Sequence, residues 1–445
     1  MESFTDQEFR ICLKVLQAVC SDTNLADNEP RFKSLIAKIN KQAKREKNRL
    51  VRKDQQKIDR LAIDSTERVR LEKSADNVAD ISMNNNFLLK PIRCYICKTK
   101  YQFLDSFYHR LCPACAKHNH QKRSQKACLK KRIAIVTGGR IKIGYELVLK
   151  LLRDGATVVA TTRFPLDAMN RLMQEKDFVE FQDRIQFYGL DLRHMPSVDE
   201  FIQHIHKHYT HIDILINNAA QTIKRPNNFY EELYIKESAH MLDIGFEKNN
   251  LIAKPNRVPS NGEWVDRSLF PAGEVDRFLQ PLDKRSKNSW VEKLDSVSRL
   301  EFVESQVINY FSPFFLTSSL KHLLIKSPFP DRYIVNVSAM EGQFSRKSKT
   351  YYHPHTNMAK AALNMMTRTS ASDYAESGIY MNSVDTGWIT QENPYPKAQS
   401  MEKSGFVPPL DEIDGAARVY DPIVQGTLGN QIYGLFLKDY EPYAW

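Results

Sequence analysis

The chain has 445 residues, of which 42% are hydrophobic and 26% are charged, and its formal net charge is +11. This length allows a large core plus one or two smaller modules, and the composition excludes a disordered or collagen-like chain. No apolar run reaches the roughly 18 residues that a transmembrane helix needs, so we expect no membrane span. The opening residues resemble neither a signal peptide nor a transit peptide, which predicts a cytoplasmic or nuclear location.

The positive charge lies in the N-terminal part of the chain. Residues 1–132 hold 29 Lys and Arg against 15 Asp and Glu, so the remainder of the chain is slightly acidic. A basic block of this kind can bind nucleic acid or an acidic protein, although a solvated helix face is the commoner explanation. Both interpretations stay open.

The first elements are expected to be helical. Thr5 and Glu8 have the spacing of a capping box, which predicts a helix that begins beside them. Residues 31–63 contain no glycine or proline and are rich in Lys, Gln and Arg, so they predict a long exposed basic helix or a helical pair. The polar residues 74–86 predict a linker. We therefore expect a basic helical region over residues 1–85.

Four of the seven cysteines form two C-x-x-C pairs that are typical of a metal site: Cys94 with Cys97, and Cys112 with Cys115. Two short turns of this kind can offer four thiolates to one tetrahedral ion, and zinc is favoured over an iron–sulfur centre. We expect a small zinc-binding module over residues 90–125, used for interaction. Four thiolates complete the zinc shell, so the nearby histidines are expected on the surface: His109, His118 and His120.

After residue 131 short β-branched runs alternate with helical stretches, which predicts an α/β fold with a Rossmann-type doubly wound parallel sheet over residues 131–445. The expected strands cover residues 132–136, 156–160, 185–188, 212–216 and 332–337, with a closing strand over 433–438. Residues 222–300 break this rhythm and predict an insertion.

The first of these strands runs directly into a glycine-rich turn and an apolar helix. The turn reads Thr137-Gly138-Gly139-Arg140-Ile141-Lys142-Ile143-Gly144. A strand, a glycine turn and a helix in this order place backbone N–H groups and a helix N-terminus against a pyrophosphate. Three further segments follow later strands: Asp191-Leu192, Asn217-Asn218-Ala219-Ala220 and Asn336-Val337-Ser338.

Together these segments resemble the short-chain dehydrogenase/reductase family over roughly 300 residues. The resemblance implies a dinucleotide cofactor, an adenine contact near Asp191 and Leu192, and a stabilising turn that contains Asn218 and Ala219. One departure is Lys142, which stands where the family has its middle glycine. Its side chain either reshapes the turn, reaches over the dinucleotide, or points to solvent.

The end of the second strand indicates which dinucleotide binds. NAD sites place an acidic residue there, whereas a 2′-phosphate needs cations and no nearby carboxylate. Thr162 occupies the acidic position, Arg163 follows it, and Arg140 lies in the glycine turn. We therefore predict NADP(H) over NAD(H).

The family's catalytic pattern is incomplete in this chain. Ser338, Lys360 and Asn309 match its serine, lysine and asparagine, but Thr356 stands in the tyrosine position. An aliphatic hydroxyl is a poor acid or base near pH 7, whereas a phenol beside a lysine can serve. The segment before Lys360 is about five residues longer than the family's usual spacing, and Tyr352 is our preferred substitute.

Other substitutes in the same loop are Tyr351, His353 and His355. The alternative is that these rings only pack the loop or line a pocket. Further along, Asp385-Thr386-Gly387 replaces the family's proline–glycine turn, and Gly387 is expected beside the nicotinamide.

Two functions follow from these residues. The first is an NADP(H)-dependent oxidoreductase that acts on a small carbonyl or alcohol, with Tyr352 or a water held by Thr356 relaying the proton. The second is a catalytically weak or inactive dinucleotide-binding scaffold whose zinc module and basic helices bind protein or nucleic acid. A homo-oligomer is also left open by the sequence.

Overall fold

The computed structural model describes residues 4–26, 30–73, 86–240, 265–346 and 348–445. The chain forms two compact units: unit 1 comprises Met1–Arg93 and Thr99–Cys112, and unit 2 comprises Cys94–Lys98 and Pro113–Trp445. Most of the predicted linker and the middle of the predicted insertion lie outside the described residues. Across the described residues, no helix combines the length and apolar character needed to cross a bilayer.

Unit 1 begins with exposed helices, which are α1 (Asp6–Ser21), a 3-10 turn (Thr23–Ala26), α2 (Pro30–Asp64) and α3 (Glu67–Glu72). The predicted capping box is present, because the Thr5 hydroxyl accepts from the backbone of Glu8 and the Glu8 carboxylate accepts from the backbone of Thr5. The long basic segment forms one continuous helix and not a pair. Its apolar side chains remain exposed, so α2 buries almost nothing within unit 1.

The rest of unit 1 is a two-stranded antiparallel hairpin of β1 (Phe87–Arg93) and β2 (Lys100–Phe103). The Asp59 carboxylate on α2 accepts hydrogen bonds from the backbone N–H groups of Leu89 and Lys90 on β1, at 2.6 and 3.2 Å. These bonds fix the C-terminal end of α2 to the hairpin.

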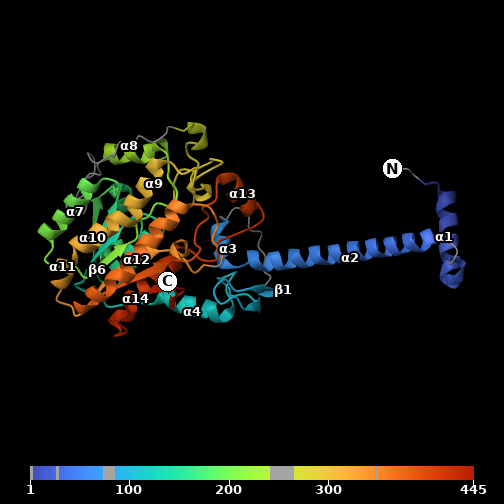
Figure 1. The fold of residues 1–445 in the computed structure, drawn as a ribbon, viewed down its shortest axis with the longest axis horizontal. Coiled ribbons are helices and arrows are strands. Elements are labelled where there is room, and N and C mark those ends of the chain that lie inside the picture. Colours follow the sequence, from blue (N-terminus) through green and yellow to red (C-terminus); the bar gives the residue numbers. More distant parts are fainter. Residues whose placement is uncertain (1–3, 27–29, 74–85, 241–264, 347) are drawn as a thin grey trace. The chain divides into compact units, whose positions relative to one another are not determined.

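Unit 2 contains an eight-stranded sheet with the order β10-β9-β8-β7-β6-β3-β4-β5. Figure 1 draws this sheet, with β6 labelled, among the helices of unit 2. All neighbours are parallel except β10, which pairs antiparallel with β9. The strands are β3 (Ile133–Thr137), β4 (Thr157–Thr162), β5 (Ile185–Gly189), β6 (Ile214–Asn217), β7 (Arg332–Ser338), β8 (Ile379–Asp385), β9 (Phe436–Lys438) and β10 (Glu441–Tyr443). The predicted Rossmann-type doubly wound sheet is confirmed. The closing strand begins three residues later than predicted, because Gly434 has a φ of +67°, outside the extended region.

Alternate side chains of the central strands pack on opposite faces of the sheet, so each face has its own core. Ala134 and Val136 join the core that includes α5 (Lys142–Arg153) and α14 (Glu412–Thr427). Ile135 between them joins the core that includes α7 (Met195–His208), α10 (Ser312–Ser319) and α12 (Pro354–Glu376). Helices therefore cover both faces of the sheet.

Shorter helices complete unit 2: α4 (Pro113–Ser124), α6 (Pro165–Leu172), α8 (Glu231–His240), α9 (Arg299–Gln306), α11 (Lys321–Ile325) and α13 (Tyr395–Lys403). Between β6 and β7 the described residues of the predicted insertion contain α8 and short 3-10 turns, and they add no strand to the sheet. The insertion therefore leaves the parallel order of the sheet intact.

Candidate active site

A cavity of about 1500 Å³ lies in unit 2 at the carboxyl ends of the parallel strands. Open α/β sheets bind their ligands at this edge. The structure brings most of the sequence-predicted site residues to its wall, namely Gly138, Arg140, Lys142, Ile143, Gly144, Thr162, Arg163, Asp191, Leu192, Asn218, Ala219, Ser338, Tyr352, Thr356, Lys360 and Gly387. Three of the predicted residues do not line it: Thr137, Gly139 and Asn309.

The glycine turn leaves no room for a side chain at its closest point. A Cβ added to Gly144 would lie 2.0 Å from the carbonyl oxygen of Gly138, which is itself held at a φ of +73°. Lys142 adopts a φ of +55°, so it takes the left-handed conformation that favours glycine. Its Nζ lies 5.1 Å from the centre of the Phe278 ring. The turn therefore keeps a glycine-like path with a lysine inside it, and this path fits a pyrophosphate.

Thr137 lies behind the cavity wall and binds the turn that follows β6. Its hydroxyl oxygen accepts hydrogen bonds from the backbone N–H groups of Asn218 and Ala219, both at 3.0 Å. The Asn218 amide in turn donates to the carbonyl of Gly138 at 3.1 Å. These bonds join the glycine turn to the turn that contains Asn218 and Ala219 after β6. Each turn therefore restricts the movement of the other.

The two predicted 2′-phosphate cations differ in their surroundings. The buried Arg140 guanidinium donates to Asp167 and to Gln280, both at 2.7 Å. Arg163 has no carboxylate within ion-pair distance among the described residues, and its guanidinium lies over the Tyr230 ring at 4.3 Å. Arg140 is therefore paired within the protein, whereas Arg163 forms no ion pair with a carboxylate among the described residues.

Thr162 and Asp191, the other predicted residues near these cations, also interact with neighbouring protein groups. The Thr162 hydroxyl accepts from the backbone N–H of Phe164 at 3.1 Å. The Asp191 carboxylate pairs with Arg193 at 2.6 Å, and Arg163 and Arg193 together hold the pKa of Asp191 below its usual value despite burial. Asp191 is therefore an ionised, positioned carboxylate at the cavity wall.

The catalytic end of the cavity contains a buried lysine. Lys360 is 6% exposed, its Nζ donates to the carbonyl of Val337 at 2.8 Å, and burial lowers its pKa to about 8. One turn earlier on α12, the buried hydroxyl of Thr356 has no hydrogen-bond partner within the described structure. Ser338 at the end of β7 donates to the Asn364 side chain at 2.6 Å. An unsatisfied hydroxyl in a cavity wall is a natural site for a bound water or a substrate oxygen.

Asn309 lies in a single π-helical turn, Val307–Phe311, between α9 and α10. Its side-chain oxygen accepts from the backbone N–H of Gln221 at 2.7 Å, and its amide donates to the Gln221 carbonyl at 3.0 Å. Asn309 therefore fixes the segment that follows the asparagine turn, one layer behind the cavity.

The candidate substitutes for the tyrosine occupy different positions. Tyr352 lines the cavity, but its hydrogen bond with Tyr351 raises the pKa of its phenol, which makes it a weaker acid. His353 also lines the cavity, stacks on Trp290 with ring centres 3.9 Å apart, and donates from Nδ1 to the Trp290 carbonyl at 2.9 Å. His355 is buried and is not part of the wall. Burial lowers the pKa of both histidines.

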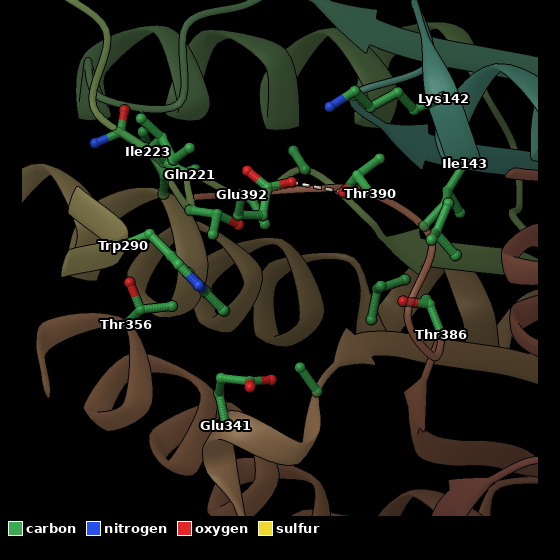
Figure 2. Close-up of a pocket in the computed structure, with 18 of the residues that line it drawn as sticks. Lys142, Ile143, Gln221, Ile223, Trp290, Glu341, Thr356, Thr386, Thr390 and Glu392 are labelled. Atoms are coloured by element: carbon green, nitrogen blue, oxygen red, sulfur yellow. Dashed lines mark hydrogen bonds between the residues drawn. The ribbon is translucent and has the colours of Figure 1, made fainter. Parts of the chain in front are cut away.

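Two acidic side chains also face this end. In Figure 2, Trp290 and Thr356 lie on one side of the cavity and Ile143 and Thr386 on the other, with Glu341 between them. Asp385 at the end of β8 is buried, accepts from the backbone N–H of Met340 at 3.1 Å, and has its pKa raised to about 6 by burial. The cavity therefore contains carboxylates that the family pattern does not predict.

Sequence reasoning missed several wall residues. Tyr95 comes from the first C-x-x-C pair, while Gln280 and Trp290 come from the predicted insertion. No motif marks any of them, because each reaches the cavity through contacts between segments that are distant in sequence. The one available signal was the aromatic residue between Cys94 and Cys97, which a metal-ligand turn does not require.

The four predicted metal ligands lie together. The sulfur atoms of Cys94, Cys97, Cys112 and Cys115 are all within 4.8 Å of one another, which is compatible with one tetrahedral zinc ion. His118 and His120 are exposed as predicted. The prediction for His109 is wrong, because it is 4% exposed, with its backbone carbonyl accepting from the Tyr101 hydroxyl at 3.2 Å.

Comparisons with known proteins place unit 2 in a family. The family model described as short chain dehydrogenase matches residues 132–246, and the one described as Enoyl-(Acyl carrier protein) reductase matches residues 287–404. The gap between them lies inside the predicted insertion.

Individual proteins and a solved structure are also similar to this chain. An uncharacterised protein of Acanthamoeba polyphaga mimivirus is 33% identical over 345 residues, which is 74% of this chain and 71% of that protein. The (-)-isopiperitenone reductase of Mentha piperita is 28% identical over 47% of this chain and 57% of its own length. An NADPH-bound carbonyl reductase structure from chicken fatty liver has a TM-score of 0.42 at 17% identity, covering 71% of this chain and all of that one.

Proposed function

Since the chain belongs to the short-chain dehydrogenase/reductase family, we propose that it is an NADP(H)-dependent oxidoreductase acting on a small carbonyl or alcohol substrate, with altered acid–base machinery. The observation that carries the proposal is the buried Lys360, which shares one cavity with the glycine turn and with the partnerless Thr356 hydroxyl. A lysine buried without a carboxylate partner is costly, and such groups are concentrated at functional sites.

The dinucleotide would lie along the carboxyl edge of β3, β4 and β6. The turn at Gly138 and Gly144 would receive the pyrophosphate, and Asp191 the adenine end. Arg163 supports NADP(H) over NAD(H), because its guanidinium lies at this wall and forms no ion pair with a carboxylate among the described residues. NADPH, when bound, supplies the hydride for carbonyl reduction.

Ser338, Lys360 and Thr356 would position the substrate and transfer the proton. The Ser338 hydroxyl and the Lys360 ammonium would orient the substrate oxygen and the cofactor ribose. A water held by the Thr356 hydroxyl would pass a proton to that oxygen, drawing on Lys360, whose pKa of about 8 makes it a workable acid near neutral pH. Tyr352 is the second choice for this relay, because its raised pKa opposes proton transfer.

The four cysteines would hold zinc. Thiolates in two C-x-x-C turns with sulfur atoms this close select a tetrahedral soft-ligand ion. Such an ion would have a structural role, because four protein ligands leave no open position for a substrate. Binding of protein or nucleic acid by the basic helices stays a prediction.

The first experiment measures NADPH consumption by the full chain against a panel of carbonyl compounds. We expect turnover that Lys360→Ala lowers by about 10²- to 10⁴-fold and that Thr356→Val lowers by about 10²-fold, because both remove parts of the proton path. Tyr352→Phe separates the two relays, because its turnover should stay within about twofold of wild type if the water held by Thr356 carries the proton. NADPH binding without turnover across the whole panel would favour the inactive-scaffold alternative.

The pH profile tests the same assignment. The pKa of Lys360 lies about two units below the usual lysine value of about 10.4, so the ammonium is present below pH 8 and lost above it. We expect kcat to fall about tenfold per pH unit above pH 8. A profile that stays flat well above pH 8 would contradict a role for the Lys360 proton.

A further inference from the structure

Tyr95, between two of the metal ligands, contacts the wall of the cofactor cavity. Its hydroxyl oxygen accepts a hydrogen bond from the backbone N–H of Trp388 at 2.9 Å, and its side chain lines the cavity. Trp388 ends the turn that follows β8, which in the family pattern covers the nicotinamide. The first cysteine pair is therefore joined to the catalytic end of the site by a direct bond within unit 2.

Two backbone contacts of that turn can be compared. Gly387 has a φ of +82°, and a Cβ placed on it would lie 3.5 Å from the Tyr95 hydroxyl, so the phenol sits directly against the turn. On the other side, the Trp388 carbonyl accepts from the backbone N–H of Leu410 at 3.4 Å, a long bond. Tyr95 supplies the shorter of these two backbone contacts.

Cys115 of the second pair lies on a helix that packs within unit 2. Helix α4 contains Cys115, and its Asn119 side chain accepts a hydrogen bond from Arg418 of α14 at 3.0 Å. Arg418 is 1% exposed and pairs with Asp439 at 3.1 Å, directly after β9. The Arg418 Nε would lie 3.7 Å from a Cβ placed on Gly387, so the side chain that α4 holds through Asn119 also approaches this turn.

A module that only bound a separate partner would need none of these contacts. Metal binding fixes the distance between the two C-x-x-C turns, because all four thiolates must meet one ion. We propose that metal binding at the four cysteines and dinucleotide binding in the cavity are thermodynamically coupled, with Tyr95 as the positioning residue that links them. This inference rests on the proposed function, in that it requires a zinc site and an NADP(H) site.

Coupling of this kind is reciprocal: zinc strengthens NADPH binding by the same factor by which NADPH strengthens zinc binding. The experiment uses the full chain. NADPH affinity is titrated by its fluorescence with the zinc-loaded protein and again after zinc is removed with a chelator, while zinc affinity is measured with and without NADPH. We expect both factors to be about tenfold, within the usual range of allosteric couplings.

Tyr95→Phe separates coupling from unfolding, because it removes one hydroxyl and leaves the cysteines in place. We expect the variant to retain zinc, to bind NADPH about tenfold more weakly, and to lose the dependence of NADPH affinity on zinc. Tyr209→Phe is the matched control: it removes a hydroxyl that bonds Gln186 away from the cavity and should bind NADPH like wild type.

Equal NADPH affinity of wild type with and without zinc, or of Tyr95→Phe and wild type, would overturn the inference and leave the proposed oxidoreductase intact. A failure of the cysteines to retain zinc would overturn it as well. If zinc-loaded wild type does not bind NADPH at all, the proposed function fails, and the coupling fails with it.

Discussion

Two parts of the cavity lie along one sheet edge: the proposed phosphate end at the glycine turn and the proposed catalytic end around Lys360. They follow the family pattern to different degrees. At the phosphate end only Lys142 departs, and its backbone still takes a φ of +55°. At the catalytic end Thr356 stands in the tyrosine position and Asp385-Thr386-Gly387 replaces the proline–glycine turn, while Tyr95 reaches the wall from the first cysteine pair.

The difference has a physical reason. A pyrophosphate is bound by backbone N–H groups at close approach, and a Cβ at the wrong place blocks that approach whatever its chemistry. A proton can reach a carbonyl oxygen from several groups, through a water if necessary. The shape of the backbone therefore restricts which residues the phosphate end tolerates. At the catalytic end the requirement is a proton donor, and more than one residue can provide it.

The largest expected effect is at Gly144. Gly144→Ala would place a Cβ 2.0 Å from the Gly138 carbonyl oxygen, which cannot move without disturbing the turn. We expect NADPH affinity to fall at least about a hundredfold, or roughly 2.8 kcal/mol, in a fluorescence titration. Gly273→Ala is the control: its φ of +79° brings backbone strain, but nothing lies within 4 Å of a Cβ there and the residue is outside the cavity. Unchanged binding by Gly144→Ala would break the shape argument.

At the catalytic end, Asp385→Asn tests the buried carboxylate. Burial raises its folded-state pKa to about 6, above the ordinary value of about 3.9, so folding favours the protonated form. The stability this provides is complete below about pH 4 and is lost as pH rises through 6. We expect Asp385→Asn to raise the free energy of unfolding by about 2 kcal/mol at pH 8 and by nearly nothing at pH 4.

Urea unfolding at the two pH values measures this difference. Asp439→Asn should give the opposite sign at pH 8, because Arg418 and Lys438 hold the pKa of Asp439 below its usual value. A loss of stability in Asp385→Asn at pH 8 would show that its ionised form is paired more strongly than its surroundings indicate.

A smaller effect is expected for Arg163→Ala. In the proposed function this guanidinium contacts the 2′-phosphate, and one charge-assisted contact corresponds to about 1.5 kcal/mol or more. We expect NADPH to bind about tenfold more weakly and NADH to be unaffected. Arg153→Ala is the matched control, since Arg153 pairs with Glu175 and Asp177 outside the cavity. An equal loss for both dinucleotides would remove the basis for NADP(H) preference.

The smallest effect is expected for Lys142→Gly. Glycine relieves the left-handed strain of about 1 kcal/mol, while the contact of the ammonium with Phe278 is lost, so stability should change by less than about 1 kcal/mol. We expect NADPH affinity to change less than about threefold, because the backbone of the turn and not the ammonium makes the contact. A tenfold loss that Lys142→Arg restores would instead indicate that the side chain reaches the dinucleotide.

The sequence by itself determined the location of most strands of the parallel sheet, the glycine turn and the clustering of the four cysteines. Each depends on local spacing: β-branched runs set strands, glycines set the turn, and two C-x-x-C pairs can converge on one ion. It also identified Lys360, Ser338 and Thr356 by position, and all three line the cavity.

Only the tertiary structure decided which of those residues are available for chemistry. No local pattern shows that Arg140 bonds Asp167 and Gln280, or that Trp388 bonds Tyr95 across 293 positions. Nor does a local pattern show that the Thr356 hydroxyl has no hydrogen-bond partner among the described residues. Local spacing sets backbone conformation, but the partner of a buried polar group depends on which distant segment packs against it.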